Sequence, residues 1–482
     1  MEIGTNYWDV RWGSGAADPF KDGYANVSGP DPWKPEFLEE TKFYTVHRFM
    51  DFNKTNDSTA VHWADRTQKS DADQRVVAYE WMADLCNRQQ ADAWVTVPHR
   101  TYEDQSYWTR LAELLLAELD PELKLYLEYS NETWNFMFDQ ATYCRDRGVE
   151  LDLDDGEYTA GFEFHVYAAV RLFERFNVVW GADNPRLIKV VAGQAANVWM
   201  TGRHLEALND PTINPNNVRP TAYAIAPYFG NGTSTIEEAG EAVATGIDRA
   251  RRHAEAVADS GLKLLGYEGG QHLLTNAHAV SRDPRIYDHY MRYLRGIAPY
   301  LEVFAHYNHS SSYHSGGAWG AKEGIGQAAT QAHKYRALTV YAGASPQPIE
   351  RTLVPFDALW RFSTDTPPDG WTTLGFDDGA WEMQENHEEP AVYLRKSFTS
   401  NLPSAESMTL TVKHDKAFVA YLNGTEVLNV AAGTTQRTYQ LDQHAHLLRP
   451  GNNVLSVKLH VDDYDKTDLS INPELTASGA SG

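Results

Sequence analysis

The sequence contains little cysteine and no long apolar run. Cys86 and Cys144 are its only cysteines, and both fall in segments with helical periodicity, so we expect two buried free thiols. Two cysteines exclude a disulfide framework and argue strongly against a zinc site built from thiolates. No apolar stretch reaches the ~18 residues that a membrane-spanning helix requires, and we therefore expect no membrane partner.

Positive charge is also scarce. The 482 residues include 42 lysines and arginines against 66 aspartates and glutamates, which gives a formal net charge of −24. A nucleic-acid-binding protein needs a basic surface to neutralise phosphates, so we expect no nucleic-acid partner. The segment Met1–Gly4 shows neither the basic nor the apolar region of a signal peptide. We therefore expect either a secreted or periplasmic protein whose signal peptide is absent from this sequence, or a cytoplasmic protein.

Aromatic residues, by contrast, are plentiful, with 14 tryptophans, 26 tyrosines and 18 phenylalanines. They could fill a large core, since 42% of the residues are hydrophobic. They could also form surfaces on which the apolar faces of sugar rings stack, because aromatic rings offer large flat apolar faces. Composition alone leaves both interpretations open.

Up to about Ala342, short apolar runs alternate with longer helical patterns, which is typical of a parallel sheet with helical crossovers. A doubly wound open sheet is the alternative, but no glycine-rich phosphate turn follows the first run. We therefore predict a (β/α)8 barrel over residues 1–345. The predicted strands are Glu2–Val10, Phe43–Phe52, Asp92–Pro98, Lys124–Glu132, Leu187–Gly193, Ala222–Phe229, Lys263–Gly270 and Leu301–Asn308. The predicted helices include Trp108–Leu119, Gly161–Phe176, Ile236–Ser260 and Asp288–Ile297.

The character of the sequence changes after Ala342. The segment Gly343–Pro348 contains two prolines and small residues, and we interpret it as a linker. Short alternating strands then follow, and Asn423-Gly424 is a strong hairpin signal between two of them. We predict an all-β jelly roll or β-sandwich over residues 346–482. Its predicted strands are Ala391–Phe398, Met408–Lys413, Ala417–Leu422 and Asn453–Leu459.

Two strands of the predicted barrel end in a glutamate. Leu125–Asn135 contains a buried strand that runs into Asn131-Glu132, and Lys263–Gly270 delivers Glu268 in the same way. Functional residues of such barrels lie at the C-terminal ends of the strands. A pair of carboxyl groups there can cleave a glycosidic bond, with one as general acid/base and the other as nucleophile. Either glutamate alone would more often be a surface residue, but the pair predicts a glycosidase.

Other predicted strand ends carry polar and aromatic residues, where a purely structural barrel would tolerate any residue type. An arginine beside the nucleophile holds the pKa of that carboxylate down, and a tyrosine hydroxyl can hydrogen-bond to it. An asparagine before the acid can bind the sugar 2-hydroxyl, and tryptophans can stack on the sugar. The candidate substrate-binding residues are Arg48, His99, Asn131, Trp134, Tyr228 and Trp319.

These motifs resemble those of the clan A glycoside hydrolases, the retaining (β/α)8 glycosidases that include many cellulases, mannanases and xylanases. In that superfamily an Asn-Glu pair after strand four carries the acid/base and a glutamate after strand seven is the nucleophile. The resemblance implies these roles for Glu132 and Glu268. It covers the barrel by architecture but only short motifs by sequence, so the chain resembles a divergent branch whose substrate does not carry over. Further matching positions are Arg48, His99, Tyr228 and Trp319.

Two other interpretations of these strand ends are disfavoured. Glu128 lies on the same face of its strand as Glu132 by alternation, and we interpret it as a partner inside the barrel rather than as the catalyst. Several histidines invite a metal site, but they fall on different loops without the i, i+4 spacing of a zinc motif. We therefore expect no catalytic metal. The histidines are His47, His99, His306, His309 and His314.

The C-terminal region also carries a resemblance. Asp415–Val427, together with Trp371–Trp381 and Tyr393–Phe398, resembles the galactose-binding-like sandwiches often appended to glycosidases. Such domains either bind carbohydrate or pack on the catalytic domain, and the short linker favours packing. A structural calcium is conceivable, because Ca²⁺ prefers carboxylate oxygens, although solvated turn acids are the simpler interpretation. We expect no other cofactor. The acids are Asp377, Asp378, Asp462 and Asp463.

Together these features predict a monomeric retaining glycoside hydrolase that cleaves β-glycosidic bonds of a polysaccharide or oligosaccharide. Asn131-Glu-Thr133 is formally a glycosylation sequon, and modification there would block the site, so we expect a bacterial source. Two rivals stay open. One is a non-catalytic carbohydrate-binding or scaffolding protein with a decayed barrel, and the other is a lyase or transglycosylase on the same scaffold.

Overall fold

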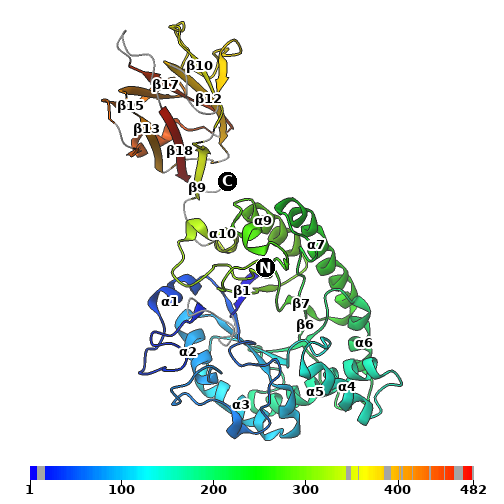
Figure 1. Cartoon of the computed structure of the whole chain (residues 1–482). Helices are drawn as coiled ribbons and strands as arrows, with labels where there is room; N and C mark the ends of the chain where they lie inside the picture. The colour runs from blue at the N-terminus through cyan, green and yellow to red at the C-terminus, as the bar shows by residue number, and fades with distance from the viewer. Residues whose placement is uncertain are drawn as a thin grey trace. The chain divides into compact units, whose positions relative to one another are not determined.

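The chain forms two compact units, Met1–Ser345 and Pro346–Gly482. The computed structural model describes residues 1–7, 17–343, 349–356, 358–384, 392–400, 402, 405, 407–414, 416–433, 436–449, 451–460 and 471–479. Most of the predicted linker and the residues Asp462 and Asp463 lie outside these described residues. Figure 1 follows the course of the chain through both units.

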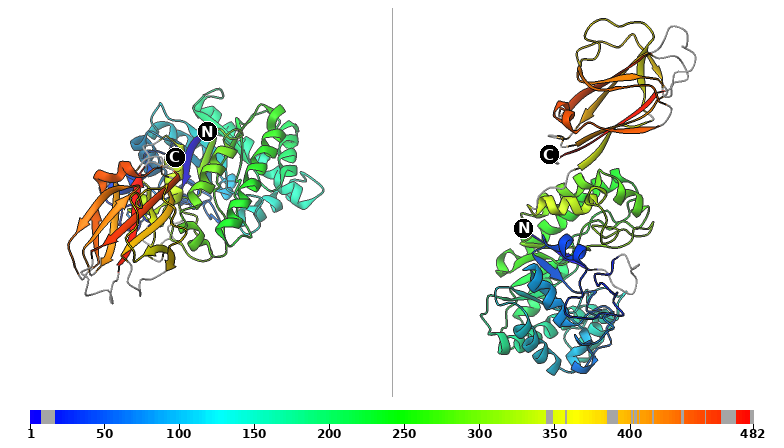
Figure 2. Two further views of the ribbon diagram at one scale, coloured as in Figure 1. Left: turned by 90° about the horizontal axis from the view of Figure 1, so that it is seen from above. Right: turned by 90° about the vertical axis from the view of Figure 1, so that its left-hand side faces the viewer.

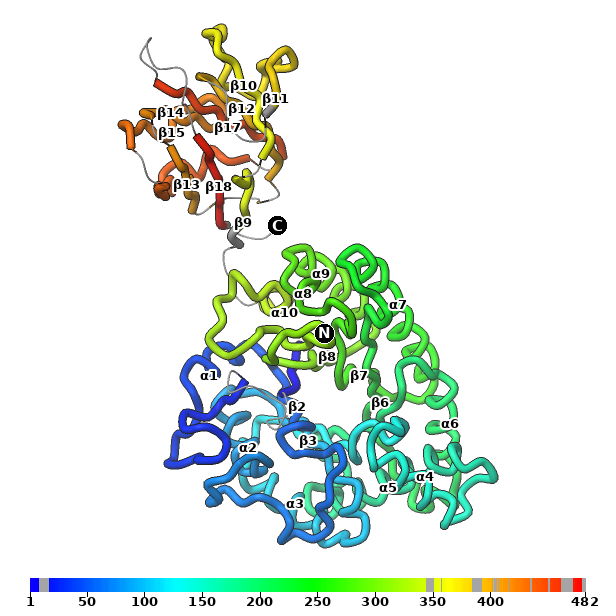
Figure 3. The backbone as a smooth tube through the Cα atoms, in the orientation of Figure 1, coloured from blue at the N-terminus to red at the C-terminus, as the bar shows by residue number. Residues whose placement is uncertain are grey.

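The first unit is a closed barrel of parallel strands in the order β1 to β8. Pairing of β1 with β8, from Glu2 opposite Val303 to Thr5 opposite His306, closes the ring. Figure 3 shows the strands inside a ring of helices. The predicted barrel is therefore confirmed. The strands are β1 (Glu2–Asn6), β2 (Val46–Arg48), β3 (Asp92–Val97), β4 (Leu125–Tyr129), β5 (Leu187–Ala192), β6 (Ala222–Ile225), β7 (Lys263–Gly266) and β8 (Val303–His306).

The helices follow from apolar periodicity and from their end residues. Helix α7, for example, begins at a capping box in which Thr235 and Glu238 each bond the backbone of the other, which satisfies N–H groups that the first turn leaves open. The four helices predicted by range occur within a few residues of their expected bounds. The helices are α1 (Pro35–Thr41), α2 (Tyr79–Gln89), α3 (Ser106–Glu118), α4 (Asp139–Glu150), α5 (Glu157–Trp180), α6 (Val198–Asn209), α7 (Ile236–Val257), α8 (Ala277–Arg282), α9 (Ile286–Ile297) and α10 (His333–Tyr341).

Strand β2 is much shorter than predicted. Its expected range was Phe43–Phe52, but the ladder spans only Val46–Arg48. After Arg48 the chain turns, and the N–H of Asn53 bonds the carbonyl of Phe49. Phe49 and Phe52 are nevertheless fully buried in the main core. The apolar run Phe43–Phe52 therefore contains a short strand and a buried loop. A sequence does not distinguish the two, because both require apolar residues.

Apolar side chains pack against both the outer and the inner face of the barrel sheet. The main core packs the helices onto the outside of the barrel. A smaller cluster fills the barrel interior and includes Val46, Trp94, Tyr126, Leu265 and Tyr267. The interior is not wholly apolar, however, because charged side chains also lie in it at the C-terminal ends of the strands.

The second unit contains two antiparallel sheets around one apolar core, and Figure 2 shows its strands in colours from yellow to red. The predicted hairpin is confirmed, since Asn423 (φ 52°) and Gly424 (φ 93°) join β14 to β15. One sheet has the order β11-β10-β12-β17-β14-β15 and the other β16-β13-β18-β9. The strands are β9 (Ile349–Val354), β10 (Trp360–Ser363), β11 (Glu382–Gln384), β12 (Tyr393–Ser400), β13 (Ser407–His414), β14 (Phe418–Leu422), β15 (Thr425–Val430), β16 (Arg437–Gln440), β17 (Gly451–Leu459) and β18 (Ile471–Gly479).

Two smaller expectations can be compared with the structure. Cys86 and Cys144 are both buried and unpaired, as predicted. Among the described helices, none is both long and apolar enough to cross a membrane.

Candidate active site

A buried arginine lies at the centre of the polar cluster inside the barrel. Arg48 is the last residue of β2 and has no exposed surface. Its guanidinium lies against the rings of Trp94 (5.6 Å) and Tyr267 (4.9 Å). Its five N–H groups all find acceptors, which fixes the plane of the guanidinium. The acceptors are Glu128 (Nη2–Oε2 3.0 Å, with Nε also donating), Glu268 (Nη1–Oε1 2.8 Å), Asn131 (Nη2–Oδ1 2.8 Å) and Asn6 (Nη1–Oδ1 3.1 Å).

Glu268 follows β7 and receives donors on both carboxyl oxygens. Arg48 donates to Oε1, and the Tyr228 hydroxyl donates to Oε2 at 3.0 Å. Only 5% of the residue is exposed. The carboxyl group is therefore held in one orientation by a cation and a phenol from two other strand ends.

Glu132 follows β4 and is held by a different set of donors. The Tyr267 hydroxyl donates to Oε1 at 3.0 Å, and the Asn135 amide donates to Oε2 at 2.8 Å. Both donors are neutral. Glu132 keeps some exposure to solvent, whereas Glu128 is almost fully buried and also accepts from the indole of Trp94 at 2.8 Å.

The backbone at the end of β4 adopts an unusual conformation. Ser130 has a φ of 59° and Glu132 a φ of 42°, both in the left-handed region that costs a non-glycine residue roughly 1–2 kcal/mol. The N–H of Ser130 still bonds the carbonyl of Val97 at 2.9 Å, so the bend begins directly after the ladder. Such strain persists where the surroundings impose it, and it clusters at functional sites.

The charges of the cluster do not balance. Glu128, Glu132 and Glu268 face one guanidinium in a region that water hardly reaches. Burial raises the pKa of Glu128 and of Glu132, and it raises the pKa of Glu268 to about 8 although Arg48 opposes the shift. We expected Arg48 to hold this pKa down, but burial is the larger effect.

The charge of Glu132 further raises the pKa of Glu268, so the two carboxyl groups titrate as a pair that keeps a shared proton to higher pH than a free carboxyl group does. Glu268 accepts from a cation, whereas Glu132 accepts only from a phenol and an amide. The contact with the cation favours the ionised form of Glu268. Of the two carboxyl groups, Glu132 has the donors that better suit a protonated form, although burial raises the pKa of Glu268 to about 8.

The other predicted residues fall into two groups. Asn131 belongs to the cluster, because it accepts from Arg48 and donates one amide N–H to Asn56 at 3.0 Å. Trp319 is linked to the site through His272, whose ring receives the indole N–H at 3.2 Å and lies 5.2 Å from the Tyr228 ring.

His99 and Trp134 do not join the hydrogen-bond network of Arg48 in the part of the chain that the structure describes. The His99 ring packs 5.0 Å from Tyr143, and burial lowers the pKa of His99 to about 4. Trp134 is half-buried in the segment after Glu132. The structure therefore places both near the predicted strand ends, but among the described residues neither is hydrogen-bonded to a carboxyl group of the pair.

Several residues of the cluster escaped the sequence analysis. Tyr267 precedes Glu268, and Asn135 closes the Glu-Thr-Trp-Asn motif, so both were visible as polar groups beside a candidate. Asn6 lay inside the predicted strand Glu2–Val10 and is the last residue of β1 only in the structure, so it gave no strand-end signal. The partners that had not been predicted are the acceptor Asn6 and the donors Trp94, Asn135 and Tyr267.

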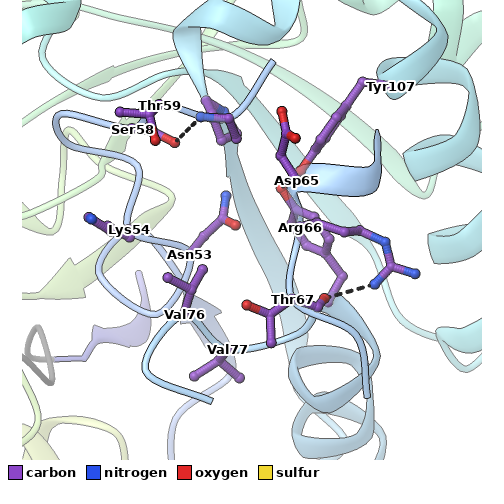
Figure 4. A pocket seen from close by; sticks show the side chains of 13 residues that line it. Asn53, Lys54, Ser58, Thr59, Asp65, Arg66, Thr67, Val76, Val77 and Tyr107 are labelled. Atoms are coloured by element: carbon purple, nitrogen blue, oxygen red, sulfur yellow. Dashed lines mark hydrogen bonds between the residues drawn. The ribbon is translucent and has the colours of Figure 1, made fainter. Parts of the chain in front are cut away.

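A separate cavity of about 380 Å³ opens beside the ends of β2 and β3. Figure 4 shows its lining, which includes Asn53, Lys54, Arg66 and Tyr107. None of the candidate catalytic residues lines it. Arg66 is already held by both carboxyl oxygens of Glu80 at 3.0 Å. The cavity is therefore distinct from the carboxyl pair.

The described residues contain no group of three or more histidine, cysteine, aspartate or glutamate side chains placed to hold a metal ion. Of the four acids considered for calcium, Asp378 accepts from Arg395 at 2.9 Å and lies 3.4 Å from Arg361. Asp377 accepts from the N–H of Gly379. A cation at Asp378 would have to displace two guanidinium groups.

Comparison with known proteins yields structural likeness only. No protein-family model matches the sequence, and no curated protein matches it either. A GH51 arabinofuranosidase from Xanthomonas axonopodis pv. citri matches 95% of this chain and 96% of its own, with 11% identity and a TM-score of 0.47. A Cellulomonas fimi endo-β-1,4-mannanase double mutant matches 100% of this chain and 94% of its own, with 11% identity and a TM-score of 0.42.

Both of these neighbours, which cover nearly the full chain, are named as enzymes that act on glycosides. A β-glycosidase from Bacteroides vulgatus matches 27% of this chain with 16% identity and a TM-score of 0.23. This chain spans only 20% of the length of that enzyme. At such identities the likenesses concern the fold and carry nothing about residues or substrate.

Proposed function

We propose that this chain is a retaining glycoside hydrolase that cleaves β-glycosidic bonds of a polysaccharide or oligosaccharide. One observation carries the proposal. Glu132 and Glu268 project from the ends of β4 and β7, and each is held by its own donors, only one set of which includes a cation. That asymmetry is what a protonated acid and an ionised nucleophile require of their surroundings.

The first chemical step uses the shared proton. A carboxylate oxygen of Glu268 attacks the anomeric carbon while Glu132 gives its proton to the leaving oxygen. The bond to the leaving group breaks as the bond to Glu268 forms. Tyr267 and Asn135 then stabilise the new negative charge on Glu132, because both already donate to its oxygens.

The second step reverses these roles. Glu132 takes a proton from water, the water oxygen attacks the anomeric carbon, and Glu268 leaves as a carboxylate beside Arg48. Two inversions give net retention. Retention also requires carboxyl groups roughly 5–5.5 Å apart. Closeness is supported by Tyr267, which adjoins Glu268 in the chain and bonds Glu132.

Asn131 and the tryptophans complete the proposed substrate site. Asn131 is fixed by Arg48 and Asn56, and an amide nitrogen has two N–H groups. The second N–H can therefore meet the sugar 2-hydroxyl. Trp319 supplies a stacking face, while we keep His99 and Trp134 as candidates for more distant contacts. We further propose a monomer that needs no cofactor and a secreted or periplasmic location.

The direct test is incubation with aryl β-glycosides and a panel of polysaccharides, with product chromatography and proton NMR of the first anomer formed. We expect reducing sugars of retained configuration. The inverted anomer as first product would contradict the double displacement. An unsaturated product would favour a lyase, and transfer to a second sugar a transglycosylase. Absence of turnover on the whole panel would favour a scaffolding protein with a decayed barrel.

A further inference from the structure

Exposed aromatic side chains gather in one sector of the barrel unit. Among the described residues, only three phenylalanines, tyrosines or tryptophans are exposed: Phe136 (43%), Tyr158 (54%) and Trp199 (57%). Single exposed apolar residues are ordinary, but a group of large rings in one place indicates a binding surface. The neighbouring Met137 is 85% exposed.

The three rings lie at the rim that carries the carboxyl pair. Phe136 follows Glu132 in the connection from β4 to α4. Trp199 lies in the first turn of α6, directly after the connection that leaves the C-terminal end of β5. Tyr158 lies in the first turn of α5, and its ring is 5.2 Å from that of Phe136.

Ring contacts join the group into a row. Tyr158 and Phe162 lie one turn apart on α5 and so share a face of the helix. The ring of Phe162 is 6.3 Å from that of Trp199. The order Phe136, Tyr158, Phe162, Trp199 therefore leads away from Glu132 across the starts of α5 and α6. We call these four residues the aromatic row.

The charges around the aromatic row select the kind of ligand. Three exposed acids lie between the end of α4 and the first residue of α5, namely Asp152, Asp155 and Glu157. The cation against the row, Arg145, lies 5.9 Å from the Phe136 ring and is paired with Asp146 at 2.7 Å. The three exposed acids would repel an anionic membrane and a uronic acid polymer alike. Uncharged sugars are not repelled, and their C–H faces can pack on the aromatic rings.

We propose that the aromatic row binds the leaving-group side of a neutral polysaccharide and makes the enzyme act within the chain. This inference rests on the proposed function, since the acid/base protonates the leaving oxygen and the leaving sugars must therefore lie on its side. Phe136 belongs to the same segment as Glu132 and begins the row there.

The test compares the wild type with the triple variant Phe136→Ala/Tyr158→Ala/Trp199→Ala. We expect kcat/KM on a neutral polymer to fall about tenfold or more, with unchanged turnover of an aryl glycoside whose leaving group is a single ring. Val178→Ala, on the last turn of α5 and 82% exposed, is the matched control and should change neither. Wild-type cleavage of the polymer by the triple variant would overturn the proposal.

Binding separates this inference from the proposed function. Glu268→Gln protein is run by native electrophoresis through gels that each contain one neutral polymer, namely hydroxyethyl cellulose, galactomannan, xylan or arabinan. A gel that contains polygalacturonate serves as the anionic probe. Retardation by a neutral polymer that the three alanines abolish supports the row even if no substrate is cleaved. Retardation by none of the neutral polymers, or by polygalacturonate alone, would refute it. Release of only monosaccharides from the chain end would refute internal cleavage.

Discussion

Arg48 in the barrel unit and Arg395 in the second unit are both buried, and their surroundings differ. Arg48 in the barrel contacts two carboxyl groups, with a third close by. Arg395 on β12 is 2% exposed and contacts a single carboxylate, Asp378, which it shares with Arg361. The rest of its donors go to backbone carbonyls, among them those of Trp371 and Thr373.

The difference lies in the balance of charge. Around Arg395 the cations outnumber the carboxylate, and backbone carbonyl oxygens accept from the remaining donors. Around Arg48 the carboxyl groups outnumber the cation, and burial raises their pKa values. Burial of more carboxyl groups than cations favours the retention of a proton, and a retained proton can be transferred. The contacts of Arg395 hold the backbone at Trp371 and Thr373, whereas the carboxyl groups around Arg48 suit the proton transfer that we propose.

The largest effect should come from removing that proton or its partner. Glu132→Gln and Glu268→Gln should each lower turnover by roughly 10²–10⁴-fold or more, because glutamine can neither donate the proton nor attack. Circular dichroism should show folded protein in both. Azide should rescue Glu268→Gly and give a product of inverted configuration. Near wild-type turnover by either Gln variant would remove that residue from the mechanism.

The two arginines can be exchanged for lysine as a matched pair. Arg48→Lys should lower kcat by about 10²-fold, because three ammonium donors cannot replace five fixed donors at a charged site. Arg395→Lys should lower the melting temperature and leave kcat on a small aryl glycoside unchanged. Equal losses of activity in both variants would contradict the assignment of a catalytic role to Arg48 and a structural role to Arg395.

Removing the second unit tests whether it has a structural role while the barrel carries the activity. All candidate site residues precede Ser345, so a chain that ends there should keep its turnover of small soluble substrates. We expect a lower melting temperature, as for a domain that supports its neighbour. An unchanged melting temperature with weaker binding to polymers would instead assign the second unit to substrate targeting.

The smallest effect concerns pH and stability. Carboxyl groups whose folded pKa lies above the unfolded value of 4.5 hold a proton that the unfolded chain has lost, and Glu268 rises to about 8. The unfolded state then binds fewer protons, so this pair costs stability increasingly as pH rises from about 5 to 8. Glu132→Gln should remove much of that cost. Its melting temperature relative to wild type should therefore rise between pH 5 and pH 8, and a constant difference would contradict the shared proton.

Sequence patterns predicted what depends on topology and local chemistry. Parallel strands end at one rim, so Arg48, Asn131 and Glu268 could be expected to meet there. The Asn423-Gly424 hairpin followed from the need for positive φ at both residues. Neither inference required knowledge of side-chain packing.

The rest of the site depends on geometry that residue types do not encode. Neither Ser130 nor Glu132 is a glycine, so their left-handed backbone left no signal. Tyr267 reaches Glu132 across the barrel only because the sheet closes. The rule that placed His99 at the rim could not tell that its ring would pack on Tyr143. The abundance of aromatic residues was plain, but which three would be exposed was not.

The contacts of Arg48 have a consequence for how the protein acquires its activity. The contact with Glu268 joins residues 220 positions apart in the chain, and those with Glu128 and Asn131 span 80 and 83 positions. Contacts of such long range form late in folding, since each requires a large loop to close first. The site therefore exists only in the fully closed barrel, and the return of activity after dilution from denaturant should follow the slowest phase of refolding.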